Sequence, residues 1–260
     1  MANQNTSISE MIANNNAKKK GISDKIVPII LGIIAICSIL ATVGIIVTLL
    51  TETITFFTRV PITEFLFSKD WNPFSSTPQY GIWALILGTL KITAIATIVA
   101  VPLGLGAALY LSEYASTRVR KIIKPILEIL SGIPTIVFGF FALTFVTPVL
   151  RSIFPELGSF NSISPGIVVG VMIIPLISSM SEDAMSSVPN KIREGALGLG
   201  ATKFEVATKV ILPAATSGIM ASIVLAISRA IGETMIVSLA AGSTPSSSLD
   251  LTGSIQTMTG

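Results

Sequence analysis

Long uninterrupted apolar segments constrain the fold of this chain more than any other feature of its sequence. An α-helix needs about 20 apolar residues to cross the hydrocarbon core of a bilayer. Charged residues make up only 12% of the chain, about half the share with which a soluble domain covers its surface. The sequence therefore predicts an all-α, polytopic transmembrane helical bundle. Its five visible spans are Ile26–Leu50, Ile82–Leu111, Ile126–Leu150, Ser164–Met180 and Ala214–Ala241.

The positions of lysine and arginine predict how this bundle is oriented. Cytoplasmic loops of membrane proteins carry an excess of these residues. With the N-terminus in the cytoplasm, twelve of the 17 lie inside, two lie within spans, and only Arg59, Lys69 and Arg151 lie outside. We therefore expect a multi-pass membrane protein with its N-terminus in the cytoplasm. Its parts are a disordered cytoplasmic N-terminus (residues 1–25) and a membrane domain (residues 26–260), with the Ser/Thr/Gly-rich tail Ser243–Gly260 as a short flexible external segment.

Several classes of function are disfavoured by what the sequence lacks. There is no histidine and the one cysteine, Cys37, lies inside an apolar segment, so we expect no metal site and no internal disulfide. The net charge of +3 sits in short clusters, whereas nucleic-acid binding needs a basic face or stripe. No Gly-x4-Gly-Lys-Ser/Thr loop is present to hold a nucleotide. We expect no enzyme and no cofactor in this chain, with energy supplied by another polypeptide.

The polar segment between the fourth and fifth spans has a regular pattern of helix signals. Pro189 and Asn190 open a short helix, and a glycine at 198 or 200 can end it. Thr202 and Glu205 have the spacing of a capping box, which starts a second helix near Lys203. Two short helices on a glycine turn can dock into a groove of a partner protein. They can equally rest on lipid headgroups as an amphipathic connector.

Charged residues inside the spans are the candidates for a transport path, because a charge there is costly unless it is paired or used. Arg229 and Glu233 are four residues apart, which places them on one face of a continuous helix, and Ser222 extends that face. Two interpretations remain open. The pair is an internal ion pair that pins helices together, or Arg229 binds an anion that crosses the membrane while Glu233 orients it.

Two further residues within the spans have alternative interpretations. Thr135 follows the break expected at Pro134, where its hydroxyl either lines a cavity or sits beside a packing kink. Lys91 lies in the second span near its outer end. We expect it to extend outward into water, and the alternative is a role in the transport path. The small residues Gly218, Ser222, Ala226 and Ala230 form a ridge that permits close helix packing.

The segment before the fifth span resembles a known family. Its run Glu194-Gly195-Ala196-x3-Gly200-x9-Val210-Ile211-Leu212-Pro213 is similar to the loop shared by permease subunits of ABC importers, Glu-Ala-Ala-x3-Gly-x9-Ile-x-Leu-Pro. It departs from that pattern at Gly195 and Val210. The resemblance implies the fold of a type I importer permease, with residues 181–213 as a cytoplasmic coupling loop. In that fold Glu194, Gly195, Ala196 and Gly200 form the elbow that docks into an ATPase, and Leu212 and Pro213 link it to the fifth span.

Three other segments resemble the phosphate-importing branch of these permeases. They are Ser228–Thr234, Ser131–Gly139, and Val101–Gly104 running on to Tyr110–Tyr114, while the outer segment from Trp71 resembles its C-type subunit. The resemblance implies phosphate as substrate and a location in the lipid bilayer of the cell (inner/plasma) membrane. It also implies a complex with an A-type permease, two ATP-binding ATPase subunits and an external phosphate-binding protein. Members of this family have six spans, so we expect the sixth to be missing here.

Alternatives to phosphate import stay open at the level of the sequence. The charge of Arg229 does not separate phosphate from sulfate, molybdate or phosphonate. A self-contained channel or secondary transporter that uses Arg229 and Glu233 as a gate is the rival class, and it has no need of the cytoplasmic elbow.

Overall fold

The structure is a computed structural model that describes residues 22–260 and divides the chain into two compact units, Met1–Pro61 and Ile62–Gly260. The described part of the first unit consists mainly of one helix, α2 (Ile22–Arg59). Its stretch Ile26–Arg59 has a mean hydropathy of 2.9, and apolar side chains are exposed around it, as a helix solvated by lipid requires. The helix begins inside the segment predicted to be disordered, of which residues 1–21 lie outside the described part.

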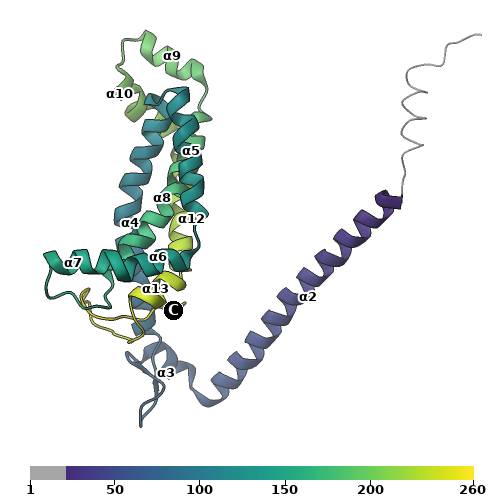
Figure 1. The fold of residues 1–260 in the computed structure, drawn as a ribbon, viewed down its shortest axis with the longest axis vertical. Helices are drawn as coiled ribbons and strands as arrows, with labels where there is room; N and C mark the ends of the chain where they lie inside the picture. The colour runs from purple at the N-terminus through teal and green to yellow at the C-terminus, as the bar shows by residue number, and fades with distance from the viewer. Residues whose placement is uncertain (1–21) are drawn as a thin grey trace, which may run out of the picture. The chain divides into compact units, whose positions relative to one another are not determined.

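Three upright helices form the centre of the second unit: α4 (Trp83–Leu109), α8 (Ile163–Ser186) and α12 (Thr216–Ile231) (Figure 1). Glycines let their backbones come close. A Cβ on Gly104 of α4 would lie 2.8 Å from Ile177 of α8, and a Cβ on Gly218 of α12 would lie 2.5 Å from the Cβ of Ala184. The ridge predicted on α12 therefore packs on α8, and Ser222, Ala226 and Ala230 are buried there.

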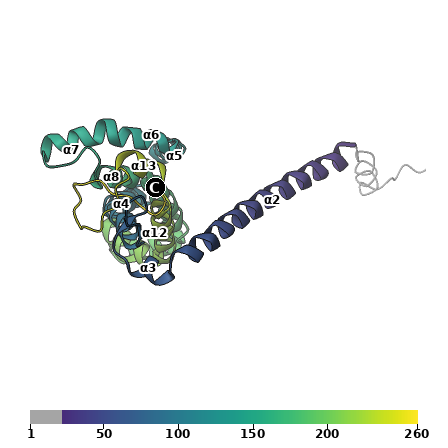
Figure 2. The ribbon, with the colours of Figure 1, turned by 90° about the horizontal axis from the view of Figure 1, so that it is seen from below.

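The third predicted span, Ile126–Leu150, has the wrong boundaries. Helix α5 (Thr117–Ser131) ends before Pro134, and α6 (Thr135–Phe141) begins after it. The reason is that proline lacks an N–H and disfavours the helical conformation in the residue before it. From α6 the helix continues through the π-helical turn η2 (Ala142–Val146) into α7 (Thr147–Ile153). The apolar stretch is therefore Thr135–Ile153. It lies across the end of the bundle, whereas α5 runs beside α8 (Figures 1 and 2).

The fourth and fifth predicted spans also differ in their boundaries. Helix α8 is longer than predicted and reaches Ser186. The predicted fifth span, Ala214–Ala241, is broken, because α12 ends at Ile231 and a separate helix, α13 (Met235–Ala240), follows. The helical stretch Lys203–Ala214 meets α12 at an angle of 72°. Among the described residues, four helices can span a membrane by length and composition, or five if this bent pair counts as one.

The tail Ser243–Gly260 is packed on the bundle, so its prediction as a flexible segment is wrong. At this end of the second unit lie α13, the helix α3 (Ile62–Phe67) and a small hairpin of β1 (Trp71–Asn72) and β2 (Gln79–Tyr80) (Figure 1). Ile255 in the tail is buried, and its N–H donates to the carbonyl of Ala241 at 3.0 Å. The N–H of Met258 donates to Oγ1 of Thr89 at 3.1 Å. We call residues 243–260 the tail strap.

Lys91 holds this strap from α4. Its ammonium donates to the carbonyl oxygens of Asp250, at 3.0 Å, and of Ser248. The side chain is buried, so the prediction that it extends into water is wrong. A buried ammonium needs hydrogen-bond acceptors in place of water, and the folded tail supplies them.

Candidate functional site

The end of the bundle opposite the tail strap carries the motif that the sequence singled out. Residues 187–215, which we call the elbow segment, join α8 to α12 and fold into α9 (Asn190–Gly198), α10 (Lys203–Glu205), the π-helical η3 (Val206–Ile211) and α11 (Leu212–Ala214). Figure 1 shows α9 and α10 at this end. The segment predicted as 181–213 therefore begins later than expected, because α8 continues to Ser186.

The predicted glycine turn of the elbow segment is confirmed at Gly200. This residue has a φ of +88°, a left-handed conformation that glycine adopts without a steric penalty. Its N–H donates to the carbonyl of Leu197 at 2.9 Å, and the N–H of Ala201 donates to that of Ala196 at 3.2 Å. This pair of bonds satisfies carbonyl groups at the end of α9 and turns the chain sharply.

The predicted capping box is also confirmed. Oγ1 of Thr202 accepts from the N–H of Glu205 at 3.3 Å, and Oε2 of Glu205 accepts from the N–H of Thr202 at 3.1 Å. The backbone hydrogen bond from Thr202, followed by the contact with Lys209, lowers the pKa of Glu205 to about 2. The carboxylate is therefore charged at neutral pH, and the start of the second helix stays capped.

The elbow segment has an anchored face and an uncovered face. Val206 and Ile211 are buried against the ends of α4, α8 and α12. On the other face, Leu199 is 92% exposed and Phe204 is 64% exposed. Glu194, Gly195 and Gly200 are exposed and Ala196 is half-buried, while Leu212 and Pro213 lie at the bend into α12. The residues of the predicted elbow thus lie together on a firmly held turn with an open apolar surface.

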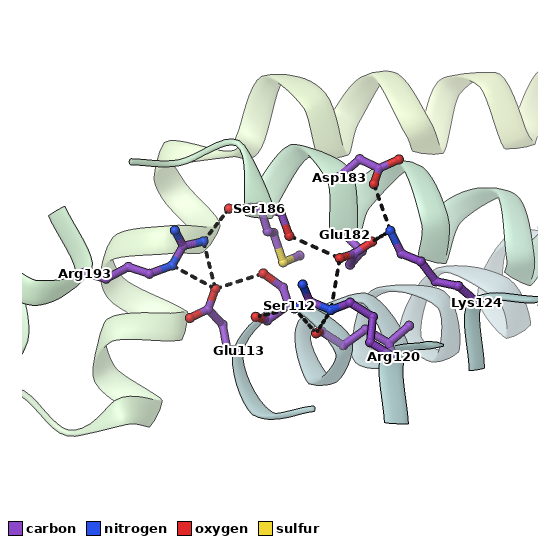
Figure 3. Close-up of polar contacts among 10 residues, drawn as sticks. Ser112, Glu113, Arg120, Lys124, Glu182, Asp183, Ser186 and Arg193 are labelled. Atoms are coloured by element: carbon purple, nitrogen blue, oxygen red, sulfur yellow. Dashed lines mark hydrogen bonds and ion pairs between the residues drawn. The ribbon is translucent and has the colours of Figure 1, made fainter. Parts of the chain in front are cut away.

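Arg193 is a site residue that the sequence analysis missed. Its guanidinium pairs with the carboxylate of Glu113 at 3.1 Å and donates to the carbonyl of Met185 at 2.7 Å. Glu113 belongs to η1 (Tyr110–Tyr114), a π-helical turn that continues α4. Figure 3 shows Arg193 and Glu113 facing one another from different helices. The two residues are 80 positions apart in sequence, so no local spacing rule points to the pair.

A second ion cluster ties α5 to α8. Glu182 of α8 is 1% exposed and pairs with Lys124 and, at 3.6 Å, with Arg120, both from α5 (Figure 3). Lys124 also contacts Asp183 at 3.2 Å. A buried carboxylate persists only when charged or polar partners replace water. The spacing of Arg120 and Lys124 by four residues was visible in the sequence, but their common partner on α8 was not.

Arg229 lines a hollow of about 210 Å³ between α5, α8 and α12. A water in the liquid occupies about 30 Å³, so the hollow has room for several waters or for a small tetrahedral anion. Besides apolar side chains, the lining includes Lys124, Glu128, Ser131 and Ser179. Two cations from separate helices therefore face one hollow.

The structure does not bring Arg229 and Glu233 together as the sequence predicted. Helix α12 ends at Ile231, with Gly232 as its C-cap, so the two residues do not share one helical face. Glu233 is buried in the break, where Oε1 accepts from the N–H of Ile236 at 3.2 Å. In the part of the chain that the structure describes, no ion pair joins Arg229 to Glu233.

The other two candidate path residues lie in different surroundings. Ser222 is fully buried between α8 and α12, with its hydroxyl 2.7 Å from that of Ser181. Thr135 is half-buried at the first position of α6. Neither residue is part of the lining of the Arg229 hollow.

Comparisons with known proteins relate these helices and the elbow segment to a family of membrane proteins. Residues 100–260 match the family model of the binding-protein-dependent transport system inner membrane component. A probable ABC transporter permease protein, YqgH of Bacillus subtilis, is 40% identical over 199 residues, which is 75% of this chain and 64% of that protein. The phosphate transport system permease protein PstC of Mesorhizobium japonicum is 36% identical over 198 residues, 69% of this chain and 60% of that protein.

A solved structure shares the fold. A chain of the MetNI methionine ABC transporter in an inward-facing conformation superposes with a TM-score of 0.51 at 23% identity, covering 62% of this chain and 74% of that chain. The chain spans 60 to 64% of the length of the two curated relatives named above. The family model covers more than half of the chain, including α8, the elbow segment and α12. The chain therefore belongs to the family of binding-protein-dependent transport system inner membrane components.

Proposed function

We propose that this chain is the membrane-spanning permease subunit of an ATP-driven phosphate importer. The observation that carries this proposal is the elbow segment, which presents an uncovered apolar turn while its other face is anchored on the ends of α4, α8 and α12. An exposed amphipathic turn of this kind suits a groove in a partner protein. Relatives named as phosphate permeases support phosphate as the substrate.

The proposed complex contains partners that this chain needs for its function. They are a second permease, two ATPase subunits that bind ATP, and an external phosphate-binding protein. The distribution of lysine and arginine supports a cytoplasmic N-terminus and a cytoplasmic elbow segment. ATPase closure then acts on α9, while the tail strap lies on the side of the binding protein.

Arg229 is the proposed contact for the anion. Its guanidinium offers several donors in a planar fork, the geometry that suits phosphate oxygens. It lines the hollow between α5, α8 and α12. Lys124 lines the same hollow but is already paired with Glu182 and Asp183, so Arg229 is the cation proposed to bind the anion. The other predicted path residues remain Thr135, Ser222 and Glu233. Of these, Glu233 is buried in the break between α12 and α13.

The test is Arg229→Ala in the complete transporter reconstituted in lipid vesicles, with radiolabelled phosphate outside and ATP available to the ATPase. We expect a fall in uptake of at least about tenfold, because a charge-assisted contact is worth about 1.5–3 kcal/mol. Arg229→Lys keeps the positive charge but loses the planar fork of donors, so its uptake should lie between that of Arg229→Ala and that of the wild type. Uptake by Arg229→Ala equal to that of the wild type contradicts the role of Arg229.

A second measurement separates the importer from a self-contained channel or secondary transporter. Deletion of residues 190–200 removes α9 and its glycine turn. The importer requires this turn, so uptake should stop although the protein still inserts. Transport that continues without the turn, or without any ATPase, favours the rival class. Competition by sulfate, molybdate or phosphonate then tests the choice of oxyanion.

A further inference from the structure

Helix α9 has little apolar attachment to the bundle. It contains no buried residue, and open space surrounds the Cβ positions of Gly195 and Gly198. A helix that transmits a push must nevertheless be fixed to what it moves. The side chain that fixes α9 is Arg193, which points inward while its neighbours on the helix point out.

Arg193 joins three elements at once. Its guanidinium bonds twice to one carboxylate oxygen of η1, at 3.1 and 3.3 Å, and it donates to carbonyls at the end of α8. Met185 lies in the last turn of α8 and Val188 just beyond it, and the negative end of a helix attracts a cation. The acceptors are Oε1 of Glu113, the carbonyl oxygens of Met185 and Val188, and Oδ1 of Asn190.

The burial of this contact gives it strength. The side chains of Arg193 and Glu113 are 17% and 12% exposed, so water and salt screen the pair far less than a surface pair. Only a guanidinium can reach the carboxylate and the two carbonyls together, because its donors are spread over a rigid plane. A lysine at this position retains the charge and loses most of these bonds.

The same π-helical turn is held from its other side by α5. Arg120 donates to the carbonyls of Leu111, at 2.6 Å, and Ser112, at 3.1 Å. Arg120 also pairs with Glu182, and Glu182 pairs with Lys124. Figure 3 shows this sequence of contacts running from Arg193 to Lys124. Because Lys124 lines the hollow beside Arg229, the contacts connect α9 to the proposed path.

We propose that Arg193 is the positioning residue through which movement of α9 reaches the substrate path. The connection runs from Arg193 to Glu113, across η1 to Arg120, and through Glu182 to Lys124. Coupling between distant sites is carried by contiguous hydrogen bonds and ion pairs, and η1 is bonded both to Arg193 and to Arg120. The inference rests on the proposed function, since it requires an ATPase that moves α9.

The test compares Arg193→Gln with Arg118→Gln in the complete reconstituted transporter. Arg118 is an exposed cation of α5 that forms no ion pair within residues 22–260, so its variant makes the same change of charge. We expect Arg193→Gln to assemble and hydrolyse ATP but to lower phosphate transported per ATP at least about fivefold, the lower end of typical coupling between sites. Arg193→Lys should be intermediate and Arg118→Gln unchanged.

A second readout does not depend on transport. Spin labels at Lys191→Cys and Lys121→Cys, in a Cys37→Ala background, measure the distance between α9 and α5 with and without ATP. We expect one narrow distribution in each state, and a broad one when Arg193→Gln is added. An unchanged distribution, or a normal ratio of transport to hydrolysis in Arg193→Gln, overturns the inference.

Two further outcomes are distinguishable. If Arg193→Gln fails to assemble, Glu113→Ala decides, because it keeps the bonds of Arg193 to the carbonyls of Met185 and Val188 and removes the side-chain acceptor that links Arg193 to η1. A normal transport ratio in that variant overturns the inference as well. If the wild-type chain never associates with an ATPase, the proposed function itself fails, and this result appears before any variant is compared.

Discussion

At the scale of single residues, the clearest physical asymmetry lies in the ion cluster around Glu182. The carboxylate is almost fully buried, whereas Lys124 and Arg120 are about one third exposed, at 33% and 36%. Loss of a cation leaves a buried charge with fewer partners. Loss of the carboxylate leaves cations that water already solvates. The two sides of the same contact therefore differ in what their removal costs.

We predict that Lys124→Met destabilises the protein more than Glu182→Gln. Breaking a buried ion pair by removing one partner costs about 3–5 kcal/mol, and Arg120 at 3.6 Å offsets part of this, so we expect a loss of about 2 kcal/mol for Lys124→Met. Glu182→Gln should cost less than about 1 kcal/mol, and the double variant should recover most of the loss. Thermal unfolding in detergent measures all three. A larger loss in Glu182→Gln than in Lys124→Met would contradict this account.

At the scale of elements, the sequence predicted local structure well and long-range structure poorly. The turn at Gly200 and the capping box of Thr202 and Glu205 depend on residues within a few positions, and both are confirmed. The third span was misplaced because its boundaries followed a run of apolar residues that continues past Pro134, although the helix is broken there. The shared face of Arg229 and Glu233 assumed a helix that in fact ends at Ile231. The partner of Arg193 lies on another helix, and no pattern within one segment indicates it.

The position of the tail strap on α4 depends on a glycine, Gly88, because a larger residue there would collide with the strap. A Cβ on Gly88 would lie 2.1 Å from the carbonyl oxygen of Gln256, a distance that forces the backbone apart. We predict that Gly88→Ala displaces the strap from α4. Amide hydrogen exchange at Ile255, whose N–H donates to Ala241, should become faster. Gly106→Ala is the matched control, because open space surrounds that position on the same helix. Equal exchange in both variants would show that Gly88 does not hold the strap.

At the scale of the second unit, the contacts among α4, α8 and α12 differ in kind from those that hold α5. Helices α4, α8 and α12 meet through glycines and small residues at close range, and such packing has few alternative arrangements. Helix α5 has no buried residue, and besides its ionic contacts only partly buried side chains join it to α8. The hollow beside Arg229 lies along this looser boundary. A push on α9 should therefore open or close the hollow by moving α5 against the other three helices.

This division predicts opposite effects for two cross-links in a Cys37→Ala background. The hydroxyls of Ser181 and Ser222 are 2.7 Å apart, so cysteines there can form a disulfide between α8 and α12. Because Ser222 is also a predicted path residue, uptake is compared between the reduced and the oxidised form of this double variant. We expect the disulfide to leave uptake unchanged, because the close packing of α8 and α12 already holds the two helices together. The second pair is a cysteine at Ser131 and a cysteine at Ser179, both in the lining of the hollow. Joining them with a short bifunctional reagent should stop uptake, and the same variant without the reagent should still take up phosphate. Uptake that stops with the first cross-link would place the moving boundary between α8 and α12 and remove the role assigned to α5.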